Sequence, residues 1–373
     1  MDLQAVFDLL RKYQAYALIA FVVAVLSTPI AANLARRLGV MDIPDRELKP
    51  HARPTPYLGG AAICLGWTIA LIAAMAQGIV AWPQLLPIML GGLAFSIIGL
   101  IDDVWEMPPK LRLSLGAVIT TTVMLSTGIG LRLAASFLHP LHIVLPEWLE
   151  IILSFLMGLF IVLGACNSTN LIDGLDGLAA GVTAVISLGF LVLATHLAIV
   201  EWARPGNPVR LVLALAMLGA VLGFLPMNFN PARIFMGDAG SVLLGYNCGV
   251  MLLLFNERGI PRWLLGGLMV FALPIFDTAL AIIRRWRSGR SIFAGDRSHF
   301  YDQLVDRGLS VRTVVLISYL LAAFFAIVGC VTIWLRLRYA LVFYIIVTAA
   351  TVAVVVKTGM DRPERSPASP PSD

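Results

Sequence analysis

Long apolar runs follow one another along almost the whole chain, and each is about as long as a bilayer is thick. A bilayer core needs about 20 apolar residues per helix. With 59% hydrophobic residues, 13% charged residues and a mean hydropathy of +0.88, the chain is far more apolar than a soluble domain. We therefore predict an all-α polytopic membrane protein with about 10 or 11 transmembrane helices. The predicted spans are residues 15–34, 57–77, 84–101, 113–131, 149–166, 178–199, 208–226, 239–255, 263–283, 313–334 and 339–357.

The basic residues predict how these spans are oriented. If the C-terminus is cytoplasmic, 18 of the 27 Lys and Arg residues lie on the cytoplasmic side, as the positive-inside rule requires. We expect one integral membrane domain over residues 1–357. A disordered cytoplasmic tail is expected over 358–373, where the sequence is rich in Pro and Ser. We expect the chain to cross its membrane several times.

Five segments on this predicted cytoplasmic side carry nearly all the candidate chemistry. They are "MDIPDRELKPHARPTPYLGG" (41–60), "LIDDVWEMPPKLRL" (100–113), "NSTNLIDGLDGLAAG" (167–181), "NFNPARIFMGDAGSVLLG" (228–245) and "RRWRSGRSIFAGDRSHFYDQLVDRGLSVR" (284–312). Some of them also have ordinary explanations: a positive-inside loop for the first, a solvated helix end for the second and a helix N-cap for Asp238. Their presence on one face favours a shared cleft.

The acidic residues in these segments suit a divalent cation. Asp102 and Asp103 are adjacent, so their mutual repulsion calls for a compensating cation or a raised pKa. Asp238 stands between two glycines directly before a span, where it can hold Mg²⁺ beside a phosphate. Asp277 lies inside an apolar span, and a carboxylate there needs a partner.

The "NSTNLIDGLDGLAAG" segment predicts a break between two spans. Its glycines let the backbone approach a ligand, and irregular backbone near membrane depth is tolerated only when buried in protein or lining a cavity. In the last segment Arg297 and His299 are suited to grip a diphosphate. Carboxylates, Gly-rich backbone and cationic side chains together fit Mg²⁺ and phosphate better than an ion pathway.

In this order, the five motifs resemble those of the polyprenyl-phosphate N-acetylhexosamine-1-phosphate transferases, over about residues 20–315. That family shares a superfamily with phospho-MurNAc-pentapeptide translocase. The resemblance implies that a cytoplasmic UDP-activated amino sugar gives its sugar-1-phosphate to undecaprenyl or another polyprenyl phosphate, releasing UMP. This would be the first membrane step of a cell-envelope polysaccharide pathway. The resemblance also favours the inner (plasma) membrane of a prokaryote, because the eukaryotic relatives usually carry a long extra cytoplasmic insertion that this chain lacks. It also implies an active-site cleft on the cytoplasmic face, dependence on Mg²⁺ (or Mn²⁺), often a homodimer, and no nucleic-acid partner.

The resemblance also implies roles for single residues. Asp102 and Asp103 are expected to be catalytic, with one of them deprotonating the acceptor phosphate, and Asp238 is expected to bind Mg²⁺. The nucleotide-sugar site is expected to include Asn170, Asp173, Asp176, Asn228 and Phe235, with Phe235 near the uracil. Phosphate is expected to meet Lys49, Arg297 and His299.

One departure from the family pattern affects the choice of sugar. Relatives that use UDP-GlcNAc usually carry an H-x-H-H run in the last loop, whereas here His299 is followed by Phe300, Tyr301 and Asp302. The pentapeptide translocases carry a still more His-rich version of that loop. Two alternatives stay open: the phospho-MurNAc-pentapeptide transferase reaction, and a membrane transporter or lipid flippase, for which the expected symmetry between halves is not found.

Overall fold

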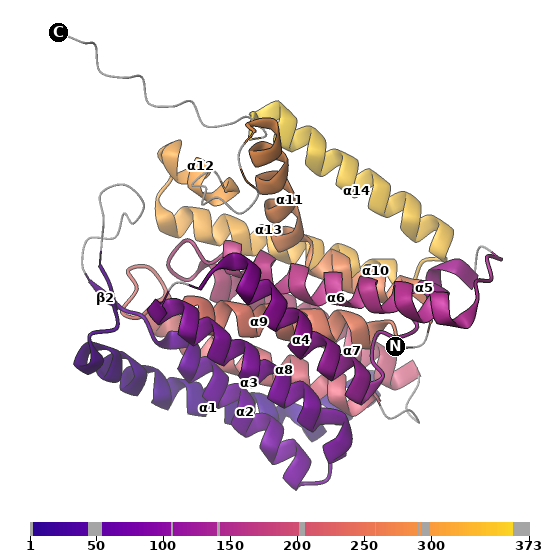
Figure 1. The fold of residues 1–373 in the computed structure, drawn as a ribbon, viewed down its shortest axis with the longest axis horizontal. Helices are drawn as coiled ribbons and strands as arrows, with labels where there is room; N and C mark the ends of the chain where they lie inside the picture. Colours follow the sequence, from indigo (N-terminus) through magenta and orange to yellow (C-terminus); the bar gives the residue numbers. More distant parts are fainter. Residues whose placement is uncertain are drawn as a thin grey trace.

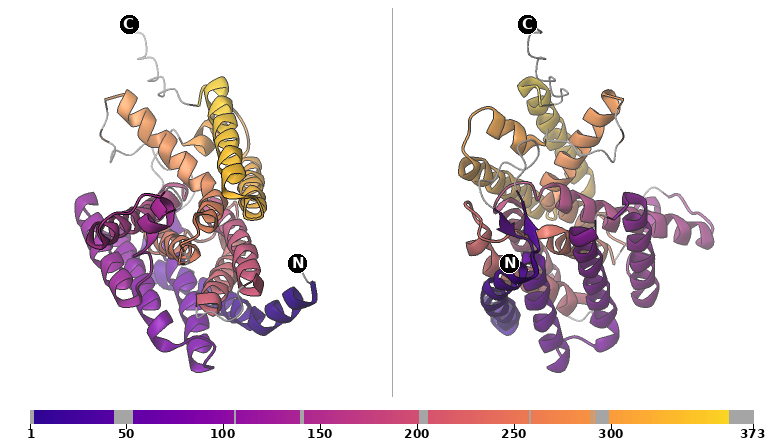
Figure 2. Two further views of the ribbon diagram at one scale, coloured as in Figure 1. Left: turned by 90° about the vertical axis from the view of Figure 1, so that its right-hand side faces the viewer. Right: turned by 60° about the vertical axis from the view of Figure 1, so that its left-hand side comes forward.

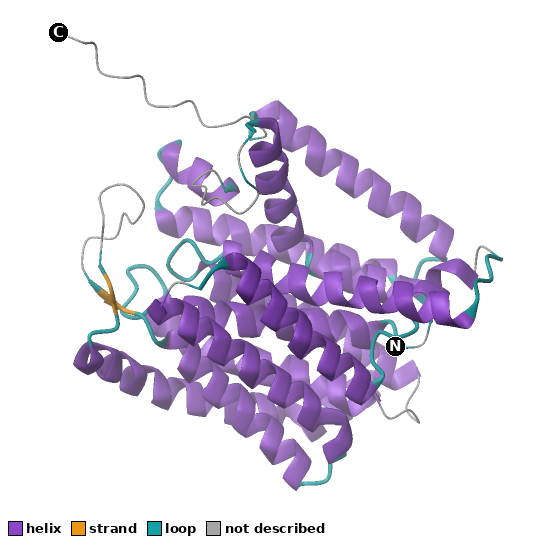
Figure 3. Ribbon diagram, viewed as in Figure 1, coloured by secondary structure: helices purple, strands orange, loops and turns teal. Residues whose placement is uncertain are grey.

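The computed structural model describes residues 3–43, 54–105, 107–139, 142–200, 206–257, 259–289, 291 and 299–360. In these ranges the chain is a bundle of α-helices with one two-stranded sheet (Figures 1 and 3). The predicted all-α class is therefore confirmed.

Nine helices in the described ranges are long and apolar enough to cross a membrane. They are α1 (Leu3–Leu38), α2 (Gly59–Ala76), α3 (Trp82–Trp105), α6 (Glu147–Leu171), α7 (Leu178–Val200), α8 (Gly206–Asn228), α9 (Gly237–Phe255), α13 (Val311–Thr332) and α14 (Leu337–Thr358). Two shorter helices, α10 (Pro261–Val270) and α11 (Ala272–Arg287), make a tenth span if they count as one, with a bend of 73° between them. The span predicted at 113–131 lies on α4 (Pro109–Thr127), a helix that is not among the nine.

The bend between α10 and α11 corrects the single straight span predicted at 263–283. Pro274 lies in the first turn of α11, four residues after the end of α10 at Val270. A proline cannot donate to the carbonyl four residues earlier, and its ring clashes with that carbonyl. The chain therefore changes direction at this point, and α11 stands apart from the main bundle (Figure 2).

Helix α9 forms the centre of the bundle, with 94% of its most apolar stretch buried. Glycines allow α2 and α3 to approach it closely. A Cβ at Gly60 would lie 2.2 Å from the backbone nitrogen of Gly240, and a Cβ at Gly99 would lie 2.4 Å from the carbonyl of Asp238. Small residues at helix interfaces permit such contacts in membrane proteins, so the start of α9 is fixed against the ends of its neighbours.

The two strands tie the first polar segment to the fourth. Strands β1 (Met41–Asp42) and β2 (Thr55–Pro56) pair antiparallel, with Met41 opposite Pro56. The backbone nitrogen of Phe235 donates to the carbonyl of Pro56 at 2.8 Å, and that of Gly59 donates to the carbonyl of Phe235 at 2.9 Å. The chain before α2 therefore runs beside the chain before α9.

The C-terminal helices pack against one side of this bundle (Figures 1 and 2). The short helix α12 (Phe300–Asp306) precedes α13, and another short helix, α5 (Leu133–Leu138), precedes α6. Side chains of Arg284, Gln303 and Arg307 donate to the carbonyls of Met360 or Thr358 at 2.8–3.2 Å. The end of α14 is thereby joined to α11, α12 and the residue after α12.

Candidate active site

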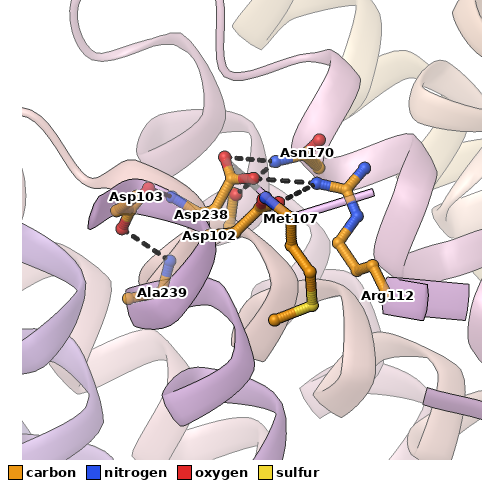
Figure 4. Close-up of polar contacts among 8 residues, drawn as sticks. Asp102, Asp103, Met107, Arg112, Asn170, Asp238 and Ala239 are labelled. Atoms are coloured by element: carbon orange, nitrogen blue, oxygen red, sulfur yellow. Dashed lines mark hydrogen bonds and ion pairs between the residues drawn. The ribbon is translucent and has the colours of Figure 1, made fainter. Parts of the chain in front are cut away.

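One guanidinium lies between two carboxylates at the end where α3, α4, α6 and α9 meet (Figure 4). The Arg112 Nη1 donates to Asp102 Oδ2 at 2.6 Å and to Asp238 Oδ2 at 2.9 Å. Asn170 Nδ2 donates to the other oxygen of Asp238 at 2.8 Å and to the hydroxyl of Ser241 at 3.1 Å. Residues from three polar segments, far apart in the sequence, therefore share one charged cluster.

Asp103 has a different position from its neighbour Asp102. Its two carboxylate oxygens accept from the backbone nitrogens of Asp238 at 2.8 Å and Ala239 at 3.2 Å, in the first turn of α9 (Figure 4). The first N–H groups of a helix have no partner within the helix, and a negative charge is favourable there. Gly237 has φ +73°, and a Cβ there would lie 2.6 Å from an Asp103 oxygen. Asp103 therefore caps α9, a role that its adjacency to Asp102 does not reveal.

The predicted break in the third segment is present, but it is short. Helix α6 continues through Asn167 and Asn170 to Leu171, and α7 begins at Leu178, so the irregular turn covers residues 172–177. Asn167 Nδ2 donates to the carbonyl of Leu163 at 2.8 Å, within its own helix. Of the two asparagines, Asn170 is the one that contacts the charged cluster.

Asp173 lies in this turn and is electrostatically coupled to the cluster. Burial raises the pKa of Asp173 to about 8, and the charges of Asp238, Asp103 and Asp176 add to the rise. Asp176 instead binds the loop before α9, because its Oδ2 accepts from Asn230 Nδ2 at 3.0 Å and from the backbone nitrogen of Ala232 at 2.9 Å. The raised pKa of Asp173 shows that the neighbouring carboxylates favour a positive charge or a proton at this place.

Asn228 and Phe235 lie on the other side of the turn. Asn228 is 3% exposed; its Oδ1 accepts from the backbone nitrogen of Gly177 and its Nδ2 donates to the carbonyl of Ile234, both at 3.1 Å. The ring of Phe235 meets that of Tyr57 edge to face, with 6.4 Å between centroids. The pKa of the Tyr57 hydroxyl is raised by burial and by the charges of Asp238 and Asp103. The loop that carries Phe235 is thus tied to the turn through Asn228.

His299 is the partner that the buried carboxylate of Asp277 was predicted to need. Its Nδ1 lies 2.6 Å from Asp277 Oδ2, and both residues are 3% exposed. Its ring stacks on Tyr301, whose hydroxyl donates to the carbonyl of Leu171 at 2.8 Å. The last polar segment therefore reaches the site through Tyr301. The other two predicted phosphate ligands, Lys49 and Arg297, lie outside the described residues.

A cavity of about 960 Å³ opens beside the cluster. Its polar lining includes Asp102, Asp103, Arg112 and Asp238. Its apolar lining comes from the end of α1, the β1 strand and the Met107–Pro109 turn. A lining that combines charged and apolar residues suits a phosphate with an apolar substituent or a sugar nucleotide.

Arg112 was not predicted as a site residue. In the sequence it was one of the basic residues that indicate how the spans are oriented. It lies ten residues after Asp102, beyond the Pro108–Pro109 pair. Pro109 takes the first position of α4, where a missing N–H costs nothing. The helix therefore starts at once, and its first turn carries Arg112 back to the end of α3. The proline pair was a usable signal for this helix start.

These residues fit a Mg²⁺ ion for which the protein would supply only some of the ligands. Among the described residues, no three His, Cys, Asp or Glu side chains are arranged as a ready set of metal ligands. Mg²⁺ is commonly held by one or two carboxylates, with substrate phosphates and water supplying the rest. A positive charge already lies between Asp102 and Asp238, and Asp173 holds a proton more tightly than usual. Both observations fit a region that attracts cations.

The chain is similar to known proteins over most of its length. The family model described as Glycosyl transferase family 4 matches residues 85–256. A probable undecaprenyl-phosphate N-acetylglucosaminyl 1-phosphate transferase of Bacillus subtilis (strain 168) is 33% identical over 349 residues, which cover 90% of this chain and 91% of that protein. A decaprenyl-phosphate N-acetylglucosaminephosphotransferase of Mycobacterium leprae (strain TN) is 31% identical, covering 94% and 89%. A phospho-N-acetylmuramoyl-pentapeptide-transferase of Shouchella clausii is 31% identical, covering 85% and 97%.

Proposed function

This chain belongs to glycosyl transferase family 4, and on that premise we propose that it transfers N-acetylhexosamine 1-phosphate from a UDP-sugar to a polyprenyl phosphate, releasing UMP. The relatives named as polyprenyl-phosphate N-acetylglucosamine phosphotransferases support the acceptor and the sugar class. The observation that carries the proposal is the cluster of Asp102, Arg112, Asn170 and Asp238, which joins three polar segments beside a cavity.

The reaction brings together two anionic phosphates, so neutralisation of charge is the first requirement. Asp238 would hold Mg²⁺, which when bound neutralises the diphosphate and stabilises the UMP leaving group. Arg112 provides a fixed positive charge at the same place. Lys49 and Arg297 remain proposed phosphate ligands.

We assign the catalytic carboxylate to Asp102 and a supporting role to Asp103. Both oxygens of Asp103 accept from backbone N–H groups that open α9, which holds Asp103 at that helix start. Asp102 accepts from the backbone nitrogen of Met107 and from Arg112, the side chain that links it to Asp238. Asp102 takes the proton of the acceptor phosphate. The freed oxygen forms a bond to the sugar-linked phosphorus of the donor, while the bond from that phosphorus to UMP breaks. We favour this direct displacement over a covalent intermediate.

The donor is proposed to lie against the 172–177 turn and the loop that carries Phe235. Asp173 and Asn170 face the charged cluster, while Asp176 and Asn228 hold the two backbone segments together. We place this site on the cytoplasmic side of the plasma membrane, because the basic residues favour that orientation. A UDP-sugar made in the cytoplasm then reaches the site without crossing the bilayer.

Release of UMP tests the proposal directly. Purified protein in detergent is supplied with Mg²⁺, undecaprenyl phosphate and, in separate reactions, UDP-GlcNAc, UDP-GalNAc, UDP-glucose and UDP-MurNAc-pentapeptide. We expect UMP and a lipid-linked sugar diphosphate with an N-acetylhexosamine donor, and none when Mg²⁺ is chelated. Product from the pentapeptide donor alone would establish the pentapeptide-transferase alternative. If none of the four donors yields UMP, the proposed reaction is refuted.

A further inference from the structure

The 172–177 turn is held at both ends by tyrosine hydroxyls from the C-terminal part of the chain. Tyr301 donates to the carbonyl of Leu171 at 2.8 Å, and Tyr319 on α13 donates to the carbonyl of Gly177 at 2.6 Å. The last carbonyls of a helix have no partner within the helix, so the bond from Tyr301 satisfies an acceptor at the end of α6. Two separate elements, α12 and α13, thus act on one turn.

Both tyrosine rings lie directly on the backbone of glycines. A Cβ at Gly174 would lie 2.3 Å from the Tyr301 hydroxyl and 2.7 Å from its ring. A Cβ at Gly181, in the first turn of α7, would lie 2.0 Å from the Tyr319 ring. Any side chain at either glycine would push the ring away. The glycines therefore allow contact between the tyrosines and the turn, in addition to letting the chain bend.

Tyr301 is itself held by the buried pair of Asp277 and His299. The His299 ring stacks on the Tyr301 ring, with 5.4 Å between centroids and 6° between planes. Asp277 accepts from the backbone nitrogen of Phe300 at 3.1 Å with one oxygen and lies 2.6 Å from His299 Nδ1 with the other. A buried carboxylate is costly unless it is paired. Here the pairing fixes the first residues of α12, and with them Tyr301.

We propose that Tyr301 and Tyr319 are positioning residues that fix the 172–177 turn, and with it Asp173, for binding of the nucleotide-sugar donor. The Asp277–His299 pair holds Tyr301 in this position. The inference rests on the proposed function, because that function places the donor at the turn. It also gives a role to Tyr301, one of the residues after His299 that stand where the family that the motifs resemble usually carries further histidines.

Conservative variants separate positioning from general stability. Tyr301→Phe and Tyr319→Phe each remove one hydroxyl and keep the ring. Tyr246→Phe is the matched control, because the Tyr246 hydroxyl also donates to a backbone carbonyl, that of Ile88, at 2.9 Å between α9 and α3. With UDP-GlcNAc as donor, we expect Tyr301→Phe and Tyr319→Phe, the two turn variants, each to raise the donor KM about fivefold. The loss of one ordinary hydrogen bond corresponds to about this factor. The KM for undecaprenyl phosphate should not change, and Tyr246→Phe should leave both values as in the wild type.

A double variant tests whether Asp277 acts through Tyr301. If the two form one chain of contacts, Asp277→Asn combined with Tyr301→Phe raises the donor KM no more than the larger single effect. If the effects multiply instead, the assignment of Asp277 to this chain is wrong. Tyr301→Phe alone still tests the positioning role of Tyr301 if Asp277→Asn does not fold.

The outcomes separate this inference from the proposed function. Wild-type protein that releases no UMP from any UDP-sugar refutes the function itself. Active wild-type protein whose Tyr301→Phe and Tyr319→Phe variants behave like Tyr246→Phe overturns the positioning role. An equal rise of both KM values in the turn variants also overturns it, because that would indicate loosening of the whole site.

Discussion

One side chain, that of Arg112, joins the two carboxylates of the charged cluster. In the part of the chain that the structure describes, the other groups that donate to Asp102 and Asp238 are the backbone nitrogen of Met107 and the amide of Asn170, both neutral. The side chain of Arg112 is 25% exposed, and those of Asp102 and Asp238 are 10% and 24% exposed. Solvent and substrate therefore reach the cluster, while water only partly weakens the attraction between its charges. The residue was visible in the sequence, but nothing local to it indicates two partners 10 and 126 residues away.

Substitution of Asp238 tests the metal assignment at the residue scale. Asp238→Asn keeps the shape and removes the charge, so we expect turnover to fall by at least about 100-fold, as when a main electrostatic contact is lost. The variant should also need more Mg²⁺ to reach half of its maximal rate. UMP release measured against Mg²⁺ concentration checks both effects. Asp8→Asn, an exposed position near the start of α1, is the control and should behave as the wild type. Near-normal turnover of Asp238→Asn would contradict the assignment.

The pH dependence of stability tests the environment of Asp173. The pKa of Asp173 is about 8 in the folded protein, against about 4 for an exposed carboxyl. Between these values the folded state holds a proton that the unfolded state has lost, so the contribution to stability is full below pH 4 and is lost as pH rises through 8. We expect the thermal midpoint without divalent cations to fall between pH 5 and 9. The thermal midpoint should fall less in Asp173→Asn. Parallel curves of thermal midpoint against pH for the two proteins would contradict the prediction.

At the scale of elements, the site depends on how closely α3 approaches α9. A Cβ at Gly99 would lie 2.4 Å from the carbonyl carbon and oxygen of Asp238, so Gly99→Ala must move the backbone of this proposed metal ligand. Overpacking of this kind costs about 1–3 kcal/mol. We expect a lower thermal midpoint and at least a tenfold loss of UMP release, about the effect of a small misplacement of catalytic groups.

Gly164→Ala is the matched control, because a Cβ at Gly164 in α6 would meet nothing within 4 Å. Alanine is favoured over glycine within a helix by up to about 1 kcal/mol. The control should therefore keep its activity and be as stable as the wild type or slightly more so. Equal behaviour of the two variants would show that the close approach of α3 to α9 does not position Asp238.

Helix ends differ in how well the sequence predicts them. The ends of α2 lie close to the predicted limits, because the apolar run stops there, whereas α3 continues four residues beyond its predicted end at 101. Helix α6 continues five residues beyond its predicted end, since Asn167 satisfies a carbonyl of its own helix and Asn170 is drawn to Asp238. The bend before α11 could have been predicted from Pro274, which apolarity alone does not mark.

At the scale of the whole molecule, labelling of cysteine variants tests the predicted orientation. Lys110 and Glu147 are both exposed, at the starts of α4 and α6, and the site lies at the end where α4 starts and α6 stops. We expect a membrane-impermeant maleimide to label Glu147→Cys in intact cells, and Lys110→Cys only after the cells are permeabilised. The native cysteines are buried apart from Cys330, which is half-buried, so a Cys330→Ser background is used. The reverse pattern would overturn the cytoplasmic location of the site.

Comparison of the whole chain with its relatives does not support the alternative of a transporter or flippase. The relatives that match most of this chain are named as transferases, at 31–33% identity. The polar residues of the described site also gather at one end of the bundle. An ion or proton pathway would need them near the middle of the membrane.

The sequence by itself determined the class of the protein, the approximate spans and the order of the polar segments, because apolar length and local composition carry that information along the chain. Only the tertiary structure decided which polar residues meet. The structure places Arg112 between Asp102 and Asp238, assigns Asp103 to the start of α9 and rests Tyr301 and Tyr319 on the 172–177 turn. These contacts depend on how closely glycines let the helices approach, and that distance is a property of the packed bundle rather than of any one segment.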